Sequence, residues 1–154
     1  MKHRSAVLCL TTIVDQRSKN ISLINVIDQV TVEKESQRPF PNEQHSKGLV
    51  VPLTADFVIH SEREKIDQSE IRDGRILIKG PDEEEIDQID FDVDLTQHMR
   101  SRNVVQFSVF PFVGAGLYRL EVLYSDVDSG EFKLVDSVPL ELVVAENVSP
   151  ESSP

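Results

Sequence analysis

Disulfide bonds within the chain are excluded, because its 154 residues include a single cysteine, Cys9. Small secreted all-β domains often depend on disulfides, so their absence favours a reducing, cytoplasmic location. Long hydrophobic runs are missing as well, since no apolar stretch approaches the roughly 20 residues of a membrane-spanning helix. We therefore expect a soluble cytoplasmic protein with no membrane partner.

Basic residues are scarce: 16 lysines and arginines stand against 27 acidic residues, which gives a net charge of -11. Such a charge repels nucleic-acid phosphates and anionic lipid headgroups, so we expect no nucleic acid as a partner. Hydrophobic residues still make up 39% of the chain, enough to build one core. The sequence predicts a single domain over residues 1–146, followed by a flexible polar tail at 147–154.

The N-terminal segment allows two interpretations. Lys2 and Arg4 precede the apolar stretch 6–10, a pattern typical of a short signal peptide or of a lipoprotein with Cys9 as the acylated residue. However, Cys9 is too close to the start for an apolar region of about 7–15 residues to precede it. Asp15 also ends the stretch early. A first β-strand accounts for the segment better.

Hydrophobic residues recur at every second position in several segments, which is the spacing of a strand with one buried and one exposed face. Segment 49–60 is the clearest case, and its Pro52 predicts an edge position or a bulge because proline has no backbone N–H. The same alternation occurs at 89–95, 118–124 and 132–144, where Asp136 interrupts it and predicts a bend or bulge.

Turn-forming residues separate these strands. One hairpin is predicted between 6–14 and 21–32, and another closes at Asp128-Ser129-Gly130. Further turns are predicted at Asp73-Gly74, Gly80-Pro81-Asp82 and Gly114-Ala115-Gly116.

Three connections are longer. Residues 33–47 are predicted to form a loop, whereas 61–70 and 96–103 form either loops or short helical turns. The predicted fold class is therefore all-β: an antiparallel β-sandwich of about eight strands, with short helical turns in its connections.

Two parts of the chain carry a family resemblance. The first comprises Leu8-Cys9-Leu10, residues 20–28 and Phe40-Pro41; the second comprises residues 111–122 with Ser137-Val138-Pro139-Leu140. Together they resemble an uncharacterised bacterial family of small immunoglobulin-like β-sandwich proteins, a domain of unknown function. The resemblance implies an immunoglobulin-like sandwich and no catalytic residues.

The resemblance also implies details at single positions. The family more often has glycine where this chain has Asn25 and Glu83. Within the matching region, Gly116-Leu117-Tyr118 is similar to the tyrosine corner of immunoglobulin-like domains, in which a tyrosine hydroxyl bonds to nearby backbone. A half-buried core aromatic is the alternative for Tyr118.

The most unusual segment is 81–94, which holds eight carboxylates and no basic residue. One interpretation is a Ca²⁺ site, but Asp90, Asp92 and Asp94 lie about 7 Å apart along one strand face, too far for one ion. A second is a solvated charge that protects a sheet edge. The third is a docking surface for a basic protein partner, with these candidate residues: Asp82, Glu83, Glu84, Glu85 and Asp87.

Catalytic groups do not cluster in the sequence. Cys9 lies inside an apolar strand, where a thiol is usually inert. The histidines are dispersed, and His60 with Glu62 or Glu64 is a weak candidate pair. No cofactor motif is found, and no metal ligands are assigned.

The closest approach to a basic patch is made by two sets of residues: Arg72, Arg75 and Lys79, and Arg100 with Arg102. We expect each of them to balance nearby carboxylates rather than to bind phosphate.

The sequence therefore predicts a non-catalytic protein–protein interaction module of the bacterial cytoplasm. It would bind its partner through loops, an edge strand or the acidic hairpin, and homo-oligomers through strand edges are an option. The alternatives are a Ca²⁺-dependent ligand-binding sandwich and a small enzyme with a site assembled from loops.

Overall fold

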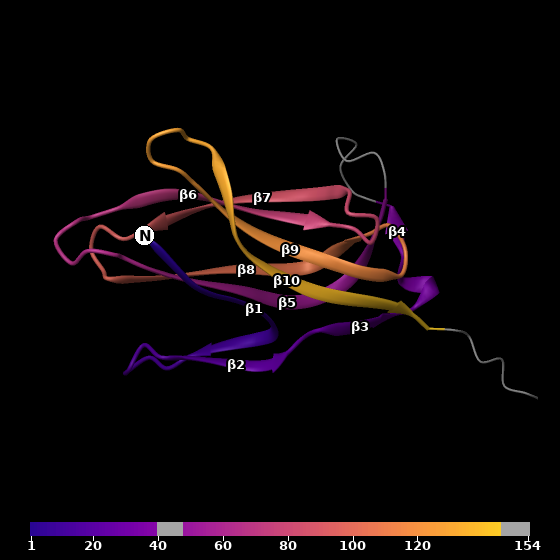
Figure 1. Cartoon of the computed structure of the whole chain (residues 1–154). Coiled ribbons are helices and arrows are strands. Elements are labelled where there is room, and N and C mark those ends of the chain that lie inside the picture. Colours follow the sequence, from indigo (N-terminus) through magenta and orange to yellow (C-terminus); the bar gives the residue numbers. More distant parts are fainter. Residues whose placement is uncertain (40–47, 146–154) are drawn as a thin grey trace, which may run out of the picture.

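The computed structural model describes residues 1–39 and 48–145, which form an all-β protein of two sheets (Figure 1). The tail predicted for 147–154 lies outside these residues, as do Phe40, Pro41 and His45. The described residues contain one short 3₁₀ helix, η1 (Lys34–Ser36), and ten strands: β1 (Lys2–Val14), β2 (Ile21–Val26), β3 (Gln29–Val32), β4 (Arg38–Pro39), β5 (Leu49–Glu62), β6 (Ile71–Lys79), β7 (Glu85–Asp94), β8 (Arg100–Phe112), β9 (Gly116–Ser125) and β10 (Phe132–Val144). No described helix has the length and apolar character needed to cross a bilayer.

The first sheet is antiparallel and centred on β5. One edge of β5 pairs with β8, and the other pairs with β1 and with the short β4, while β2 pairs with the far edge of β1. The second sheet is curled and has the order β3-β10-β9-β6-β7. It is mixed, because β3 runs parallel to β10.

The predicted all-β class is confirmed, but the strand number and the pairing direction differ. The described residues form ten strands, and β3 is parallel to β10. The run 21–32 was predicted as one strand, but it divides into β2 in the first sheet and β3 in the second. Asn25 adopts a φ of 53°, and Ile27 then donates its amide to the Leu8 carbonyl at 2.8 Å. The chain thus changes sheets between these strands, and it enters the second sheet beside β10 in the parallel direction.

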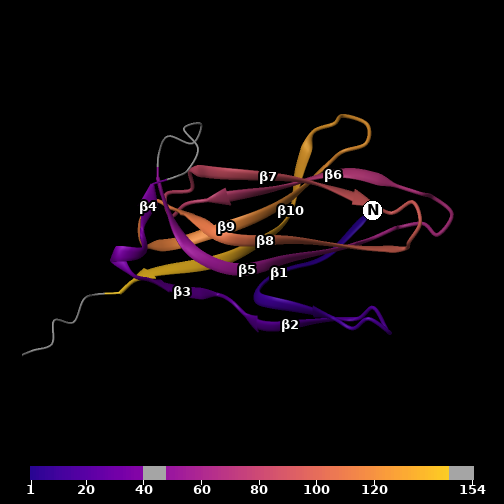
Figure 2. The same ribbon diagram turned by 180° about the vertical axis from the view of Figure 1, so that it is seen from behind.

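The core lies between the two sheets, as the alternation predicts. Along β5, every second side chain is buried in this core: Val51, Leu53, Ala55, Phe57 and Ile59. β6, β9 and β10 supply the facing layer, which includes Ile76, Leu120 and Leu140. Seen from behind in Figure 2, the β1–β2 hairpin lies at the side of the molecule away from β6 and β7.

Tyr118 forms the hydroxyl-to-backbone contacts of a tyrosine corner. Its ring is fully buried at the start of β9. Its hydroxyl donates to the Gly114 carbonyl at 2.7 Å and accepts from the Val113 amide at 2.9 Å. The contacts predicted for a tyrosine corner are therefore present, and the alternative is wrong in degree, because Tyr118 is a fully buried core aromatic and not a half-buried one.

The turn predicted at Asp73-Gly74 is wrong, because both residues lie inside β6. A Cβ atom built on Gly74 would lie 2.3 Å from Cζ of Phe91, its partner across the strand pair. Glycine stands there because the Phe91 ring occupies the space of a side chain, and not because the backbone turns.

Some of the remaining local predictions are confirmed, and others are wrong. Pro52 stands at a bulge in the pairing of β5 with β8, and the register of β10 shifts between Leu134 and Asp136, so both irregularities are confirmed. Helical turns at 61–70 and 96–103 are not formed; the single turn of helix described is η1. Asn25 and Glu83, where the resemblance implies glycine, both have positive φ, 53° and 62°. Glycine favours this backbone region, which explains why it would suit both positions.

Candidate functional site

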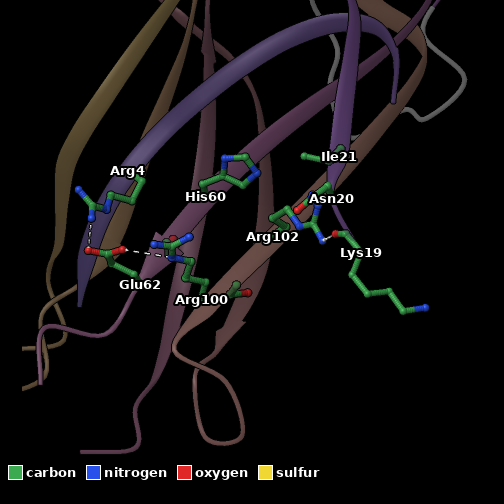
Figure 3. Close-up of a pocket in the computed structure, with 10 residues that line it drawn as sticks. Arg4, Lys19, Asn20, Ile21, His60, Glu62, Arg100 and Arg102 are labelled. Atoms are coloured by element: carbon green, nitrogen blue, oxygen red, sulfur yellow. Dashed lines mark hydrogen bonds and ion pairs between the residues drawn. The ribbon is translucent and has the colours of Figure 1, made fainter. Parts of the chain in front are cut away.

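An open groove of about 610 Å³ lies on the outer face of the first sheet (Figure 3). Its floor comes from the N-terminal part of β1, the C-terminal end of β5 and the start of β8. The turn between β1 and β2 forms one wall. Ten residues line it: Arg4, Lys19, Asn20, Ile21, His60, Ser61, Glu62, Arg100, Ser101 and Arg102.

Strand alternation places the polar residues of β5 on this outer face. Ile59 points into the core, so His60 and Glu62 on the other parity point outward. The antiparallel register with β8 sets Arg102 opposite His60 and Arg100 opposite Glu62. Directly opposed residues of neighbouring strands lie within about 4.5–5.5 Å at Cβ, so β-pairing alone brings these charges together.

The β1–β2 hairpin covers part of the same face and walls the groove. Its Thr12 donates from both the backbone amide and the hydroxyl to Oδ2 of Asp56 on β5, each at 2.9 Å. At its tip, the Lys19 carbonyl accepts a hydrogen bond from Nη2 of Arg102 (Figure 3). These contacts hold the arching hairpin against β5 and β8, and they fix the Arg102 guanidinium beside the groove.

The groove is positive in a negative protein. Its lining has four basic residues, Arg4, Lys19, Arg100 and Arg102, against one carboxylate, Glu62, so its formal charge is 4 − 1 = +3 with His60 neutral. The whole chain carries -11. Charges held together on a low-dielectric surface focus the local potential, so the groove attracts anions despite the net charge.

Glu62 fixes two of these arginines. Its Oε1 lies 2.6 Å from Nη2 of Arg4, and its Oε2 lies 3.6 Å from Nε of Arg100. The hydrogen bond from Arg4 is the main cause that lowers the pKa of Glu62, so the carboxylate is ionised at neutral pH. Arg4 therefore neutralises Glu62, and the charges of Arg100 and Arg102 remain largely uncompensated. Arg102 forms no ion pair with any described residue.

His60 is the least satisfied polar group in the groove. Its Nδ1 lies 3.2 Å from Oγ of Ser5, whereas its Nε2 is buried and has no hydrogen-bond partner among the described residues. Burial lowers the pKa of His60, and the nearby charges of Arg102 and His3 lower it further, so the ring is neutral at pH 7. A buried ring nitrogen without a hydrogen bond destabilises the folded state.

The residues predicted for partner binding lie elsewhere. Asp82, Glu83 and Glu84 form the turn between β6 and β7, while Glu85 and Asp87 are in β7, the edge strand of the second sheet. Glu83 pairs with Arg119 at 3.1 Å, which reduces the free charge of the turn. Asp82, Glu84 and Glu85 are exposed. The structure keeps this acidic hairpin together and separates it from the groove, which belongs to the other sheet.

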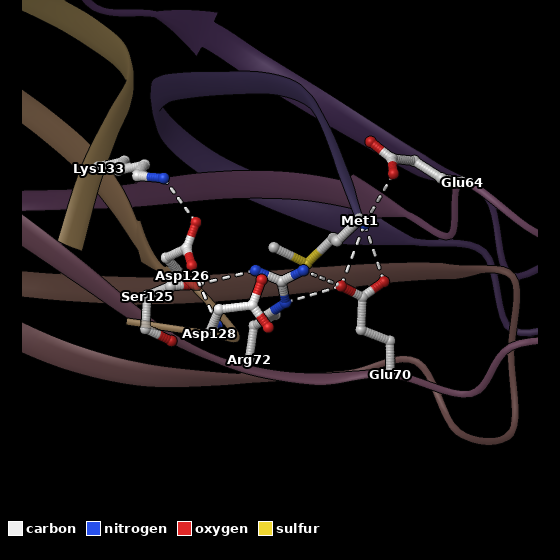
Figure 4. A network of polar contacts seen from close by, with 8 residues as sticks. All are labelled: Met1, Glu64, Glu70, Arg72, Ser125, Asp126, Asp128 and Lys133. Carbon is white, nitrogen blue, oxygen red and sulfur yellow. Dashed lines mark hydrogen bonds and ion pairs between the residues drawn. The ribbon is translucent and has the colours of Figure 1, made fainter. Parts of the chain in front are cut away.

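Most of the predicted charge pairs are present. Arg72 binds Glu70, Arg75 binds Asp90 and Lys79 binds Glu121, with N–O distances of 2.5 Å, 2.7 Å and 3.2 Å. The first belongs to a network at one end of the sandwich, where Glu70 also contacts the Met1 amino group (Figure 4). The expectation that Arg100 and Arg102 would do the same is wrong for Arg102.

The same network includes the β9–β10 turn (Figure 4). Arg72 donates from Nη1 to the Ser125 carbonyl at 2.9 Å, and the neighbouring Asp126 binds Lys133 at 2.5 Å. The hydrogen bond from Lys133 and the backbone amides of the turn lower the pKa of Asp126. All these groups are paired with one another, so the cluster is a structural clamp on the turn and offers little to a ligand.

A second polar chain lies between the sheets. The Tyr124 hydroxyl is 2.7 Å from Oγ of Ser61 and 3.2 Å from Nδ1 of His3, whose Nε2 is 2.8 Å from Oδ2 of Asp136. The residue types are those of a nucleophile and its base, but Ser61 and Tyr124 are buried. This chain joins four strands from both sheets and is closed to a substrate.

Neither the cysteine nor the carboxylates form a reactive centre among the described residues. Cys9 is buried, and burial raises the pKa of its thiol. Within residues 1–39 and 48–145, no three His, Cys, Asp or Glu side chains are grouped to hold a metal ion.

Sequence reasoning missed the groove because its members come from distant segments. The sequence pairs Arg100 with Arg102, and His60 with Glu62 or Glu64, but nothing in it joins these two pairs to each other or to Arg4. The alternation of 49–60 places His60 on the exposed face of its strand, and Glu62 continues that face two residues later. Arg100 and Arg102, which are also two residues apart, lie on one face of another strand. The alternation does not reveal the register in which β5 pairs with β8, and this register brings the two pairs together.

Comparison with models of known protein families, with curated proteins and with solved structures gave no match. The description that stands is a two-sheet all-β protein, and no family is identified for it.

Proposed function

We propose that this protein is a non-catalytic binding module whose protein partner presents an anionic group to the groove. The observation that carries the proposal is that Arg100 and Arg102 line the groove together, Arg102 in no ion pair with a described residue and Arg100 in a single long one, 3.6 Å from Glu62. Guanidinium and imidazole N–H groups donate strong hydrogen bonds to anionic oxygens. The acidic hairpin remains a predicted second contact.

The surroundings of the groove support a protein as the partner. The β1–β2 hairpin that walls it carries large apolar side chains in contact with solvent: Ile13 is 57% exposed, Val14 50% and Val26 66%. Exposed apolar residues beside a charged anchor are typical of protein interfaces. The net charge of -11 disfavours a long polyanion such as nucleic acid, while a single anionic group at the groove meets a positive potential.

The orientation of His60 supports binding over catalysis. In a serine–histidine–carboxylate triad, one ring nitrogen contacts the serine and a carboxylate orients the ring through the other nitrogen. Here Ser5 contacts Nδ1, and no described carboxylate contacts Nε2. A cytoplasmic location belongs to the same proposal, and the single cysteine supports it.

We also propose that the strand topology is immunoglobulin-like. β5 neighbours β8 in one sheet, and the other has the order β10-β9-β6, which matches strands B and E and strands G, F and C. Tyr118 near the start of β9, the F position, also supports this assignment. β1 pairs with β5 where strand A pairs with strand B, and β2 is an addition on the outer side of β1.

A titration of the ¹⁵N-labelled protein with sodium sulfate at constant ionic strength tests the proposed groove. Saturable amide shifts are expected at His60, Arg102 and the Lys19 turn. An Arg100→Gln/Arg102→Gln variant is expected to lose them, whereas Lys65→Gln, which removes an exposed positive charge elsewhere, keeps them. Shifts scattered over the surface, or equal loss in both variants, would contradict the proposal.

A partner purified from the native cell distinguishes the two surfaces. Binding is expected to weaken at high salt and to fail with Arg100→Gln/Arg102→Gln. A Glu84→Gln/Glu85→Gln variant is the comparison for the acidic hairpin. If that variant loses the partner and the arginine variant keeps it, the acidic hairpin is the contact and the groove is not.

A further inference from the structure

The hydrogen-bond donors of the groove come from two neighbouring strands, β5 and β8. Arg100 and Arg102 rise from β8, and His60 lies across from them on β5 (Figure 3). Arg102 uses one N–H of Nη2 for the Lys19 carbonyl, and a guanidinium has five N–H donors, so four remain for a ligand. A carboxylate offers two coplanar oxygens, which a single guanidinium satisfies. Donors on separate strands suit an anion with oxygens in three directions.

The charges in the groove also favour a phosphate over a carboxylate. Arg4 neutralises Glu62 at 2.6 Å, and the side chain of Lys19 extends away from the other lining residues (Figure 3), so Arg100 and Arg102 supply the two positive charges that face a ligand. A phosphomonoester carries about -1.5 to -2 at neutral pH, whereas a carboxylate carries a single negative charge. A carboxylate ligand would therefore leave one guanidinium uncompensated, and a phosphomonoester would compensate both.

The size of the groove indicates that the anionic group is part of a larger molecule. Its volume of about 610 Å³ is in the range of sites for small organic ligands, roughly 300–1,000 Å³. A free inorganic ion would leave most of this space to solvent. Ile21 adds an apolar part to the wall, where a carbon-bearing group can pack.

We propose that the groove binds a phosphomonoester group carried by a protein side chain, with Arg100 and Arg102 holding the phosphoryl oxygens beside His60. This rests on the proposed function and narrows its anionic group to phosphate. Oγ of Ser5 lies 3.2 Å from Nδ1 of His60, and this contact helps to hold the ring opposite Arg102. Lys19 contributes its carbonyl, which positions Arg102.

The test compares three peptides of one sequence, acetyl-Gly-X-Gly-amide, in which X is phosphoserine, glutamate or serine. NMR titration is expected to give the phosphoserine peptide an affinity at least about tenfold above that of the glutamate peptide, since one charge-assisted hydrogen bond accounts for about that factor. Arg100→Gln and Arg102→Gln are each expected to lose about tenfold, while Lys65→Gln changes nothing. Circular dichroism establishes that each variant is folded.

The outcomes separate this inference from the function on which it rests. Equal binding of the phosphoserine and glutamate peptides would overturn the phosphate assignment and leave an anion-binding module. Inorganic phosphate serves as a further probe; if it binds as tightly as the phosphoserine peptide, the ligand is the free ion and the proposal fails. If neither sulfate nor any peptide shifts the groove amides, both proposals fail.

Discussion

Ser5 and His60 face each other across the β1–β5 pair, with Oγ of the serine 3.2 Å from Nδ1 of the histidine. This contact holds the ring by Nδ1, while Nε2 is buried and has no hydrogen-bond partner among the described residues. A buried polar atom without a hydrogen bond destabilises the fold. The ligand-free state therefore carries a local cost at the point where the arginines gather.

The lowered pKa of His60 predicts that anion binding strengthens as the pH falls. In the free protein the pKa of His60 lies below its ordinary value of 6.5, because of burial and of the charges of Arg102 and His3. A bound anion stabilises the protonated ring and raises its pKa, so binding takes up a proton. Sulfate keeps its charge from about pH 5.5 to pH 8 and is the appropriate probe. Its affinity is expected to rise several-fold over that range as the pH is lowered.

The control for this prediction is His60→Gln, whose amide keeps a donor and cannot titrate. Its sulfate affinity is expected to be independent of pH. The other charged groups around the ring are Arg4, Glu62 and Arg100, and they are the same in both proteins. A wild-type affinity that does not change with pH, or a variant with the same slope, would show that His60 is not the group that takes up the proton.

The same pKa has a consequence for stability without ligand. Because folding lowers the pKa of His60, the unfolded chain binds more protons there than the folded one below about pH 6.5. Its contribution to stability is complete above that pH and is lost as the pH falls through the lowered value. Thermal unfolding is therefore expected to show a decrease in Tm between about pH 7.5 and pH 5.5 that is smaller in His60→Gln.

Glu62→Gln is expected to increase sulfate affinity severalfold at low salt. The substitution removes the one carboxylate of the groove, raises its formal charge from +3 to +4 and releases Arg4 and Arg100 from their ion pairs. The gain is electrostatic and should shrink as salt is added. Calorimetric titration at two ionic strengths measures it, with Glu64→Gln, an exposed neighbour outside the groove, as the matched control. A weaker-binding Glu62→Gln protein would mean that ordered arginines matter more than net charge.

The two-sheet class could be predicted from the sequence because it depends on local alternation. Phe57 and Ile59 belong to a parity that is apolar from Leu49 onward, and only a pleated strand segregates such residues. The turn at Gly114-Ala115-Gly116 followed from glycine chemistry, and the Tyr118 contacts from its place after it. Each of these features is encoded within a few neighbouring residues.

The features that escaped prediction depend on contacts between distant segments. Gly74 looks like a turn residue unless Phe91 is known to lie against it. The groove requires the register that sets Arg102 opposite His60, and the hairpin whose Lys19 carbonyl holds that arginine. Neither spacing nor composition carries this information, since register is set by the whole sheet.

Tyr118→Phe is expected to reduce the free energy of unfolding by about 1–3 kcal/mol, because it removes two part-buried hydrogen bonds, to the Gly114 carbonyl and from the Val113 amide, each of which contributes about 0.5–1.5 kcal/mol. Urea unfolding measures the change. The ring and its packing against Phe110 are retained, so the m-value should stay constant. An unchanged midpoint would mean that water replaces the hydroxyl in the turn.

Gly74→Ala is expected to reduce the free energy of unfolding by about 1–3 kcal/mol, because the new methyl group would lie 2.3 Å from Cζ of Phe91 and must displace the ring. The cause is steric and pairwise, so the effect should depend on Phe91. In a Phe91→Leu background the same substitution is expected to cost much less, since the smaller side chain leaves the space open. Urea unfolding of the wild type, both single variants and the double variant gives the coupling energy between the two positions. A coupling near zero would mean that Gly74 is required for its backbone conformation, and the account given for its place inside β6 would be wrong.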